Sequence, residues 1–142
     1  MAELHCRPLD PADIPDMKEI LLSDGGEYLP DRIAAFLNGT GNLAFGAFLD
    51  GRLIGLLYGY TLCRLDSRGP QFFVYSLDVL ADFRNRGAGS ALFQYAADHC
   101  RAAGYSEIFA ATDKGNVPAC RVYEKAGGRS HYADEIIYVA EW

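Results

Sequence analysis

Two stretches of the sequence combine residue types and spacings that could do chemistry. The first runs from Leu77 to Gly89 (LDVLADFRNRGAG), where an apolar β-type run ends and a turn with Gly87 and Gly89 opens a helical pattern. Backbone N–H groups in the first turn of a helix lack partners within the helix, the helix dipole adds positive character, and glycine lets an anion approach the main chain. The turn therefore predicts a phosphate-binding site; the alternative is a plain connection between a strand and a helix.

Two other nucleotide-binding motifs do not fit this stretch. A P-loop requires Gly-Lys followed by Ser or Thr, which is absent, and the dinucleotide fingerprint requires a third Gly or an Ala where Leu92 stands. Glu107 lies 20 residues after Gly87, as a ribose-binding acid would, but the strand ends too early for the tight turn of that fold.

The second stretch, Asn116 to Gly128 (NVPACRVYEKAGG), has the pattern of a capped helix that ends at glycines. Asn116 is a favoured N-cap, Pro118 suits the first turn, and Tyr123 follows Asn116 by about two helical turns, which places both on one face. A tyrosine hydroxyl near a leaving thiolate could act as a general acid. The alternative is that Tyr123 only packs against the core.

The elements that position these stretches follow from hydrophobic periodicity and turn residues. We expect one domain over residues 1–142, of the α+β (α/β) class, with a mixed, mostly antiparallel central sheet flanked by helices. The expected strands are Leu4–Arg7, Leu43–Leu49, Leu53–Leu62, Phe72–Leu80, Ile108–Ala111 and Glu135–Trp142, with a hairpin turn at Asp50-Gly51. The expected helices are Pro11–Leu22, Pro30–Asn38, one from Gly89 to Gly104, and one from Asn116 to about Ala126.

Composition excludes several kinds of partner. The 142 residues include 13 basic and 19 acidic side chains, so the net charge of −6 would repel nucleic acid from most of the surface. No apolar run approaches the ~20 residues of a membrane span, and Met1 to Pro8 lacks the features of a signal peptide, so we expect a cytoplasmic protein without membrane partners. The four cysteines are widely spaced, which predicts reduced thiols and no metal site.

Acidic side chains are concentrated near the N-terminus. Between Asp10 and Asp31 the sequence has seven acidic residues and one basic residue, Lys18. This acid-rich segment forms either a solvated face or an electrostatic funnel for a positively charged substrate.

Together the two stretches resemble the GNAT superfamily of acetyl-CoA-dependent N-acetyltransferases. The family pattern Arg/Gln-x-x-Gly-x-Gly/Ala is met by Arg84, Gly87 and Gly89, and the later helix from Asn to Tyr is met by Asn116 and Tyr123. The order of elements matches along essentially the whole chain.

This resemblance implies acetyl-CoA as the cofactor and assigns residues to it. The main chain of Leu77 to Val79 would pair with the pantetheine arm, Asn116 would anchor that arm, and Tyr123 would protonate the departing thiolate. The turn that opens the helix would hold the pyrophosphate, with Arg84, Asn85, Arg86, Gly87, Ala88, Gly89 and Ser90 as its residues.

Within the superfamily, the sequence is most similar in its short motifs to the type I aminoglycoside 3-N-acetyltransferases. The shared features include Ala44 to Gly55 (AFGAFLDGRLIG) and Tyr75 before Leu77, whereas Ser76 stands where those enzymes carry an aspartate. The resemblance implies transfer of acetyl to a primary amine of a polycationic small molecule, with a homodimer as one possible assembly. The alternatives are a protein lysine or N-terminus, a polyamine, or a non-catalytic acyl-CoA sensor.

An amine acceptor must lose a proton before or during attack, and a carboxylate can take it directly or through water. Asp78 lies on the strand beside the expected thioester, although strand alternation points it to the face opposite Leu77 and Val79. We take Asp78 as the candidate base. The candidate acceptor-binding residues are Glu27, Tyr75, Ser76, Asp134 and Glu135.

Overall fold

The computed structural model describes residues 3–130 and 136–142. In this part of the chain the centre is a five-stranded sheet in the order β1-β2-β3-β4-β5. The pairs β1–β2, β2–β3 and β3–β4 are antiparallel, and β4–β5 is parallel, which confirms the mixed, mostly antiparallel sheet. The strands are β1 (Leu4–Pro8), β2 (Asn42–Leu49), β3 (Arg52–Leu62), β4 (Gln71–Val79) and β5 (Glu107–Ala110).

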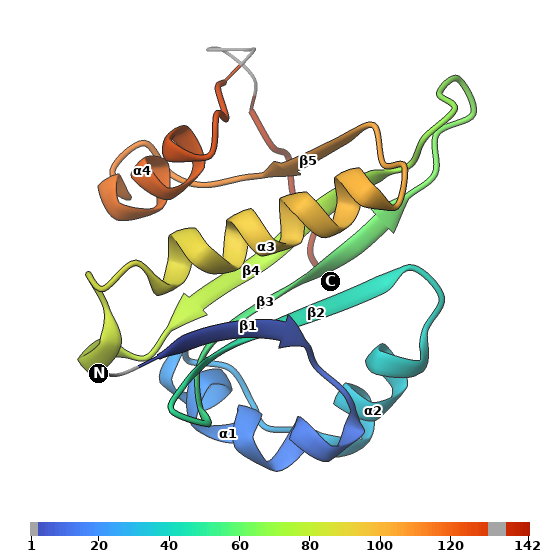
Figure 1. Cartoon of the computed structure of the whole chain (residues 1–142). Helices are drawn as coiled ribbons and strands as arrows, with labels where there is room; N and C mark the ends of the chain where they lie inside the picture. The colour runs from blue at the N-terminus through green and yellow to red at the C-terminus, as the bar shows by residue number, and fades with distance from the viewer. Residues whose placement is uncertain (1–2, 131–135) are drawn as a thin grey trace.

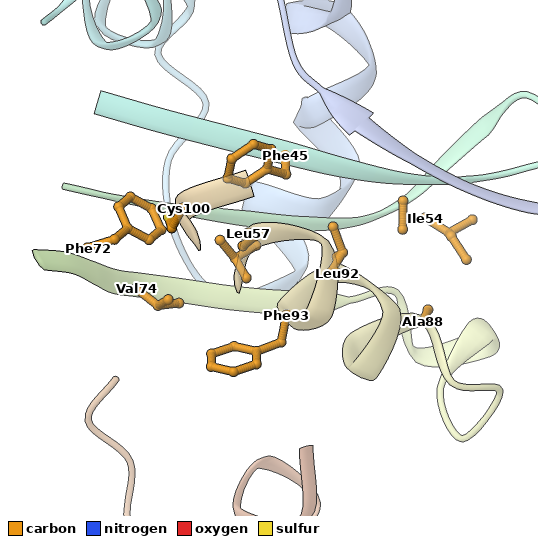
Figure 2. Packing of buried hydrophobic residues seen from close by; sticks show 11 residues of the cluster. Phe45, Ile54, Leu57, Phe72, Val74, Ala88, Leu92, Phe93 and Cys100 are labelled. Atoms are coloured by element: carbon orange, nitrogen blue, oxygen red, sulfur yellow. The ribbon is translucent and has the colours of Figure 1, made fainter. Parts of the chain in front are cut away.

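Helices cover both faces of the sheet (Figure 1). The long helix α3 packs on one face, where its Leu92 and Phe93 join Phe45, Leu57 and Phe72 in a buried cluster (Figure 2). On the other face, α1 and α2 pack over a second cluster. The helices are α1 (Ile14–Ser23), after a short 3-10 turn Pro11–Asp13, α2 (Pro30–Asn38), α3 (Ala88–Ala102) and α4 (Val117–Lys125), with a second 3-10 turn at Ala81–Phe83.

The hairpin between β2 and β3 forms at the predicted residues. Asp50 and Gly51 have φ angles of +48° and +85°, so both lie in the left-handed region that a two-residue type I′ turn requires. Leu49 pairs directly with Arg52 across the turn. The local chemistry of Asp-Gly therefore sets the register next to the turn, and a bulge beyond Phe48 shifts the register by one residue for the rest of the pair.

The predicted closing strand over Glu135–Trp142 is wrong for the residues that the structure describes. Residues 136–142 have no secondary structure, and their apolar side chains are exposed, with Ile137 at 79% and Trp142 at 108%. An apolar run becomes a strand only where a neighbour supplies the hydrogen-bond ladder and a face to pack on. These residues have neither; Glu135 lies outside the described residues.

An ion pair joins β1 to the start of the first helical segment. Asp13 accepts two hydrogen bonds from the Arg7 guanidinium, both at 2.8 Å, and a third from the backbone N–H of Asp10 at 2.9 Å. The side chain of Asp13 is only 8% exposed, and the Arg7 guanidinium also lies 4.2 Å from the centre of the Phe48 ring. One of the seven acids of the acid-rich segment is therefore neutralised inside the fold and cannot contribute to a funnel.

We predict that Asp13→Asn lowers the free energy of unfolding at pH 7 by about 1–3 kcal/mol, because Arg7 loses its buried partner. The Arg7 hydrogen bonds hold the pKa of Asp13 below its usual value. The stabilisation is therefore present above the unfolded pKa of about 3.9 and is lost as the pH falls through the folded value. Urea unfolding between pH 7 and pH 2.5 measures this difference.

The matched control is Asp98→Asn, which removes the exposed Arg101–Asp98 pair at 3.2 Å. It should change the free energy of unfolding by less than about 0.5 kcal/mol, because both side chains remain solvated. A stability difference between Asp13→Asn and the unsubstituted chain that stays constant down to pH 2.5 contradicts the assignment.

Candidate functional site

Strand β4 is paired on one side along its whole length but on the other side only at its beginning. Towards β5, the ladder joins Gln71–Val74 to Glu107–Ala110 and then stops. Towards β3, pairing continues to Val79, which lies opposite Gly55. From Tyr75 to Val79, the β5 side of β4 therefore has no strand partner in the described chain. Such an open edge can hydrogen-bond an extended ligand as an added strand would.

A β-bulge lies where this edge opens. Tyr58 pairs with Ser76 while Gly59 pairs with Val74, which leaves Tyr75 as the extra residue in β4. A Cβ at position 59 would collide with the Phe73 carbonyl, so only glycine fits there. The bulge places both Tyr75 and Ser76 on the face that carries α1 and α2.

The turn between β4 and α3 has the geometry of an anion site. Asn85 and Gly87 have φ angles of +63° and +84°, and α3 begins at Ala88 with Gly87 as its N-cap. A Cβ at Gly87 would meet nothing within 4 Å, so the space above the turn is open to a ligand. The first-turn amides, which include those of Gly89 and Ser90, have no acceptor within the helix. These residues fit a phosphate group.

Arg84 joins the turn that opens α3 to the end of β4. Its Nε donates to the carbonyl oxygen of Val79 at 2.9 Å, which ties the turn to the end of β4. This bond positions the turn. Its acceptor belongs to the Leu77–Val79 main chain that is predicted to pair with the pantetheine arm, and a carbonyl oxygen can accept a second hydrogen bond. The Arg86 guanidinium, in contrast, lies 5.7 Å from the centre of the Phe83 ring.

Both ends of helix α4 are anchored by side-chain and backbone hydrogen bonds. Asn116 caps its start, with Oδ1 accepting from the Ala119 N–H at 3.2 Å, as predicted. At its end, Gly127 has φ +91° and the Gly128 N–H donates to the Tyr123 carbonyl at 2.9 Å, which forms a Schellman motif. This motif holds the backbone of Tyr123 in place.

The side chain of Tyr123 is half-buried between α4 and α3. Its ring lies edge-on to Phe93, with 5.0 Å between the ring centroids. Burial raises the pKa of Tyr123, and the negative charge of Asp78 raises it further. The hydroxyl of Tyr123 therefore remains protonated at neutral pH.

Asp78 is also half-buried, on the opposite face of β4 from Leu77 and Val79, as alternation predicted. It accepts a hydrogen bond from the Ser76 hydroxyl at 2.7 Å. Burial raises the pKa of Asp78 despite that bond, and Asp24 raises it further through its charge and a shared hydrogen bond.

Asp24 is a neighbour of Asp78 that no sequence motif marks. It is the residue after the end of α1, and the way α1 packs on the sheet brings its carboxyl to Asp78. The only signal in the sequence was its membership of the acid-rich segment. Within that segment, Asp13 is paired with Arg7, and Glu19 is paired with Arg52 at 3.2 Å. The segment as a whole is therefore not a free acidic wall.

The remaining acceptor candidates are less well placed or lie outside the described residues. Glu27 is exposed on the connection between α1 and α2. Asp134 and Glu135 belong to the undescribed residues 131–135. Within residues 3–130 and 136–142, no helix is long and apolar enough to cross a membrane. The same residues contain no group of three or more His, Cys, Asp or Glu side chains arranged to hold a metal ion.

An open β4 edge that leads to a glycine turn at a helix N-terminus is the arrangement expected of an acyl-CoA-dependent transferase. The model of the acetyltransferase (GNAT) family matches residues 14–128 of this chain. The chain belongs to that family; it is an acetyltransferase, and acetyl-CoA is its acetyl donor. None of the curated proteins matches the chain in sequence.

Solved structures share the fold at low sequence identity. The aminoglycoside acetyltransferase meta-AAC0020 from an uncultured soil metagenomic sample, in complex with sisomicin, is 20% identical, with a TM-score of 0.83 and 97% of both chains covered. The aminoglycoside N-acetyltransferase AAC(6')-Iy in complex with CoA is 18% identical, with a TM-score of 0.81 and 99% of this chain and 96% of that chain covered. The ribosomal-protein-alanine N-acetyltransferase from Brucella melitensis biovar Abortus 2308 is 20% identical, with a TM-score of 0.79 and 97% and 100% covered. These likenesses confirm the GNAT-like fold of the chain.

We predict that Gly87→Asp weakens the binding of coenzyme A more than Gly87→Asn does. Both side chains tolerate the left-handed backbone at φ +84°, but only Asp adds a negative charge beside the first-turn amides. We expect the affinity of Gly87→Asp to be lower than that of Gly87→Asn by about tenfold or more, or ~1.4 kcal/mol. Isothermal titration calorimetry with coenzyme A measures the difference, and equal affinities of the two variants contradict the phosphate site.

Proposed function

We propose that the chain is an N-acetyltransferase that acts on a primary amine of a small polycationic molecule, with an aminoglycoside as the leading acceptor class. The observation that carries this proposal is the position of two protonatable groups, Asp78 and Tyr123, beside the part of β4 that no strand covers. The aminoglycoside enzymes among the similar structures support the acceptor class. The short sequence motifs shared with the type I enzymes make the 3-amino group the expected position of transfer.

Acetyl-CoA supplies the activated acetyl group as a thioester. In the proposed arrangement, the backbone of Leu77 and neighbouring residues on the open β4 edge would hold the pantetheine arm. The amides from Arg86 to Ser90 would hold the pyrophosphate, because the turn there is open and its first-turn N–H groups are available. Asn116 uses its oxygen to cap α4, which leaves its side-chain NH₂ to donate to the arm.

Asp78 is the proposed general base. Its carboxylate would accept a proton from the acceptor ammonium or amine, directly or through water. The Ser76 hydroxyl orients that carboxylate by donating to Oδ2 at 2.7 Å. Ser76 therefore takes a positioning role at the place where the similar type I enzymes carry an aspartate, and Asp78 supplies the acid that Ser76 lacks.

Tyr123 is the proposed general acid. Its raised pKa keeps the hydroxyl protonated, and its packing against Phe93 together with the Schellman motif limits its movement. The hydroxyl would give its proton to the departing thiolate.

The experiment that tests the proposed function is thiol release from acetyl-CoA with a panel of amines. The panel contains an aminoglycoside, a linear polyamine, and peptides with a free lysine or a free N-terminus. Preference for the aminoglycoside, with the product acetylated at the 3-amino group, supports the proposal. Preference for the polyamine or a peptide contradicts it, and binding of acetyl-CoA without thiol release from any amine indicates a sensor.

We predict that Tyr123→Phe lowers kcat by about 10²–10⁴-fold and leaves the affinity for acetyl-CoA nearly unchanged, because only the hydroxyl is deleted. Steady-state kinetics on any accepted amine measures both values. The control is Tyr105→Phe, which removes a hydroxyl that contacts Thr61 at 2.7 Å and should affect stability more than kcat. If the Tyr123→Phe variant keeps the kcat of the unsubstituted enzyme, Tyr123 is not the general acid.

We predict that Asp24→Asn moves the acidic limb of the pH profile of kcat/KM to lower pH. Burial and Asp24 both raise the pKa of Asp78, so removing the Asp24 charge lowers that pKa and lets Asp78 act as a base at lower pH. Asp16→Asn, which neutralises an exposed acid in the first turn of the same helix, should leave the limb in place. An unmoved limb in Asp24→Asn excludes the coupling of the two carboxyls.

A further inference from the structure

Four aromatic rings form a closed circuit on the sheet face that carries α1 and α2. Phe36 of α2 meets Tyr58 and Tyr60 of β3 edge-on, with 5.4 and 5.5 Å between ring centroids. Tyr75, the extra residue of the β4 bulge, meets the same two rings at 5.6 and 5.9 Å. We refer to Phe36, Tyr58, Tyr60 and Tyr75 as the four-ring cluster. Because each ring touches two others, the cluster is held in one arrangement.

The four-ring cluster is open to solvent at one side. Tyr75 is 62% exposed and Tyr60 is 36% exposed, whereas Tyr58 is half-buried and packs towards α1 and α2. The rings of Tyr60 and Tyr75 stand at 87° to each other, so together they form an apolar corner. Such a corner gains free energy when a ligand fills it and covers both rings. The cluster therefore has the form of a binding platform next to the candidate base.

Polar groups lie at the edge of this platform. Tyr58 pairs with Ser76, whose hydroxyl donates to Asp78, so the base is beside the cluster. Burial raises the pKa of Tyr58, and Tyr60, Tyr75, Asp78 and Asp24 each raise it further, which places the phenol of Tyr58 within electrostatic range of two phenols and two carboxyls. Among the described residues, none of the three tyrosine hydroxyls of the cluster has a hydrogen-bond partner. These hydroxyls can therefore bind a ligand.

We propose that the four-ring cluster and Asp24 recognise an acceptor whose amine is carried on a hydroxylated saturated ring, that is, an aminosugar or an aminocyclitol, and that they select it over a flexible linear amine. This inference rests on the proposed function and adds the residues that determine specificity. The C–H face of the ring packs on Tyr75, the edge of the ring lies against Tyr60, and the ring hydroxyls exchange hydrogen bonds with the phenols. The ammonium group lies between the aromatic faces and the two carboxylates, both of which favour a cation.

Rigidity separates a ring-borne amine from a linear one of the same charge. A ring covers the platform without losing internal rotations, whereas a linear polyamine must immobilise several bonds to make comparable contact. The carboxylates alone would not discriminate, because they attract both cations equally. Discrimination must therefore come from the aromatic part of the site.

The test compares neamine with spermine, which has the same number of amino groups on a linear chain. We expect the unsubstituted enzyme to prefer neamine in kcat/KM, and Tyr75→Ala to lower the ratio of the two kcat/KM values roughly tenfold, mainly through the KM of neamine. Tyr75→Phe keeps the ring and deletes the hydroxyl, so it should lose only part of the preference. Since Tyr75 is largely exposed, both variants should fold, and circular dichroism verifies that they do.

The matched control is Tyr95→Phe, because Tyr95 lies on α3 across the sheet and packs on Phe45. It should leave the ratio unchanged. An active enzyme whose preference survives in both Tyr75→Ala and Tyr60→Ala overturns the inference while the proposed function stands. If the enzyme acetylates neither amine, the proposed function fails, and calorimetry then decides the inference: neamine binding that weakens in Tyr75→Ala supports it, and absent or unchanged binding overturns it.

Discussion

The site depends on one constraint: strand β4 must be paired along its whole length on one side and left open beyond Val74 on the other. The pairing with β3 keeps the strand extended, and the short β5 ends early enough to expose its edge. Gly59 permits the bulge by leaving room for the Phe73 carbonyl, and Arg84 closes the far end by binding the Val79 carbonyl. Each of these features serves to hold an unpaired strand edge in a defined place without a neighbouring strand.

The charges of the protein are used in two different ways. Asp13 and Glu19 are engaged by arginines, so they stabilise the connection between the first helices and the sheet. Asp78, in contrast, has a raised pKa, because it is half-buried and because the charge and a hydrogen bond of Asp24 add to the effect of burial. A carboxyl with a raised pKa holds a proton more tightly than a free aspartate and is a better base once it is deprotonated. The net charge of −6 therefore does not by itself define an acidic surface, because two acids of the acid-rich segment are paired with arginines.

Local signals in the sequence predicted the features that local chemistry determines. The Asp50-Gly51 turn, the Asn116 cap and the Gly87 turn each depend on the conformational preference of the residues present. The sequence could not show the bulge at Tyr75, because a bulge is defined by the partner strand and not by the bulged one. It likewise could not bring Asp24 to Asp78, since that proximity arises from the packing of α1. The predicted closing strand failed over residues 136–142 because an apolar run in the sequence does not by itself provide a partner strand.

The two halves of the candidate site differ in composition: one is made mainly of backbone groups and the other of side chains. This difference explains how similar folds can serve different acceptors. The part proposed for the acetyl donor consists mainly of backbone groups, namely the β4 edge and the first-turn amides of α3, joined by the side chains of Asn116 and Tyr123. The part proposed for the acceptor consists of side chains on the α1 and α2 face: three tyrosines, Phe36 and the carboxyl groups of Asp24 and Asp78. Side chains change without altering the fold, so structures with TM-scores near 0.8 can act on an aminoglycoside in one case and a ribosomal protein in another. The acceptor of this chain must therefore be inferred from its tyrosines and carboxyls, because the fold alone does not distinguish between the alternatives.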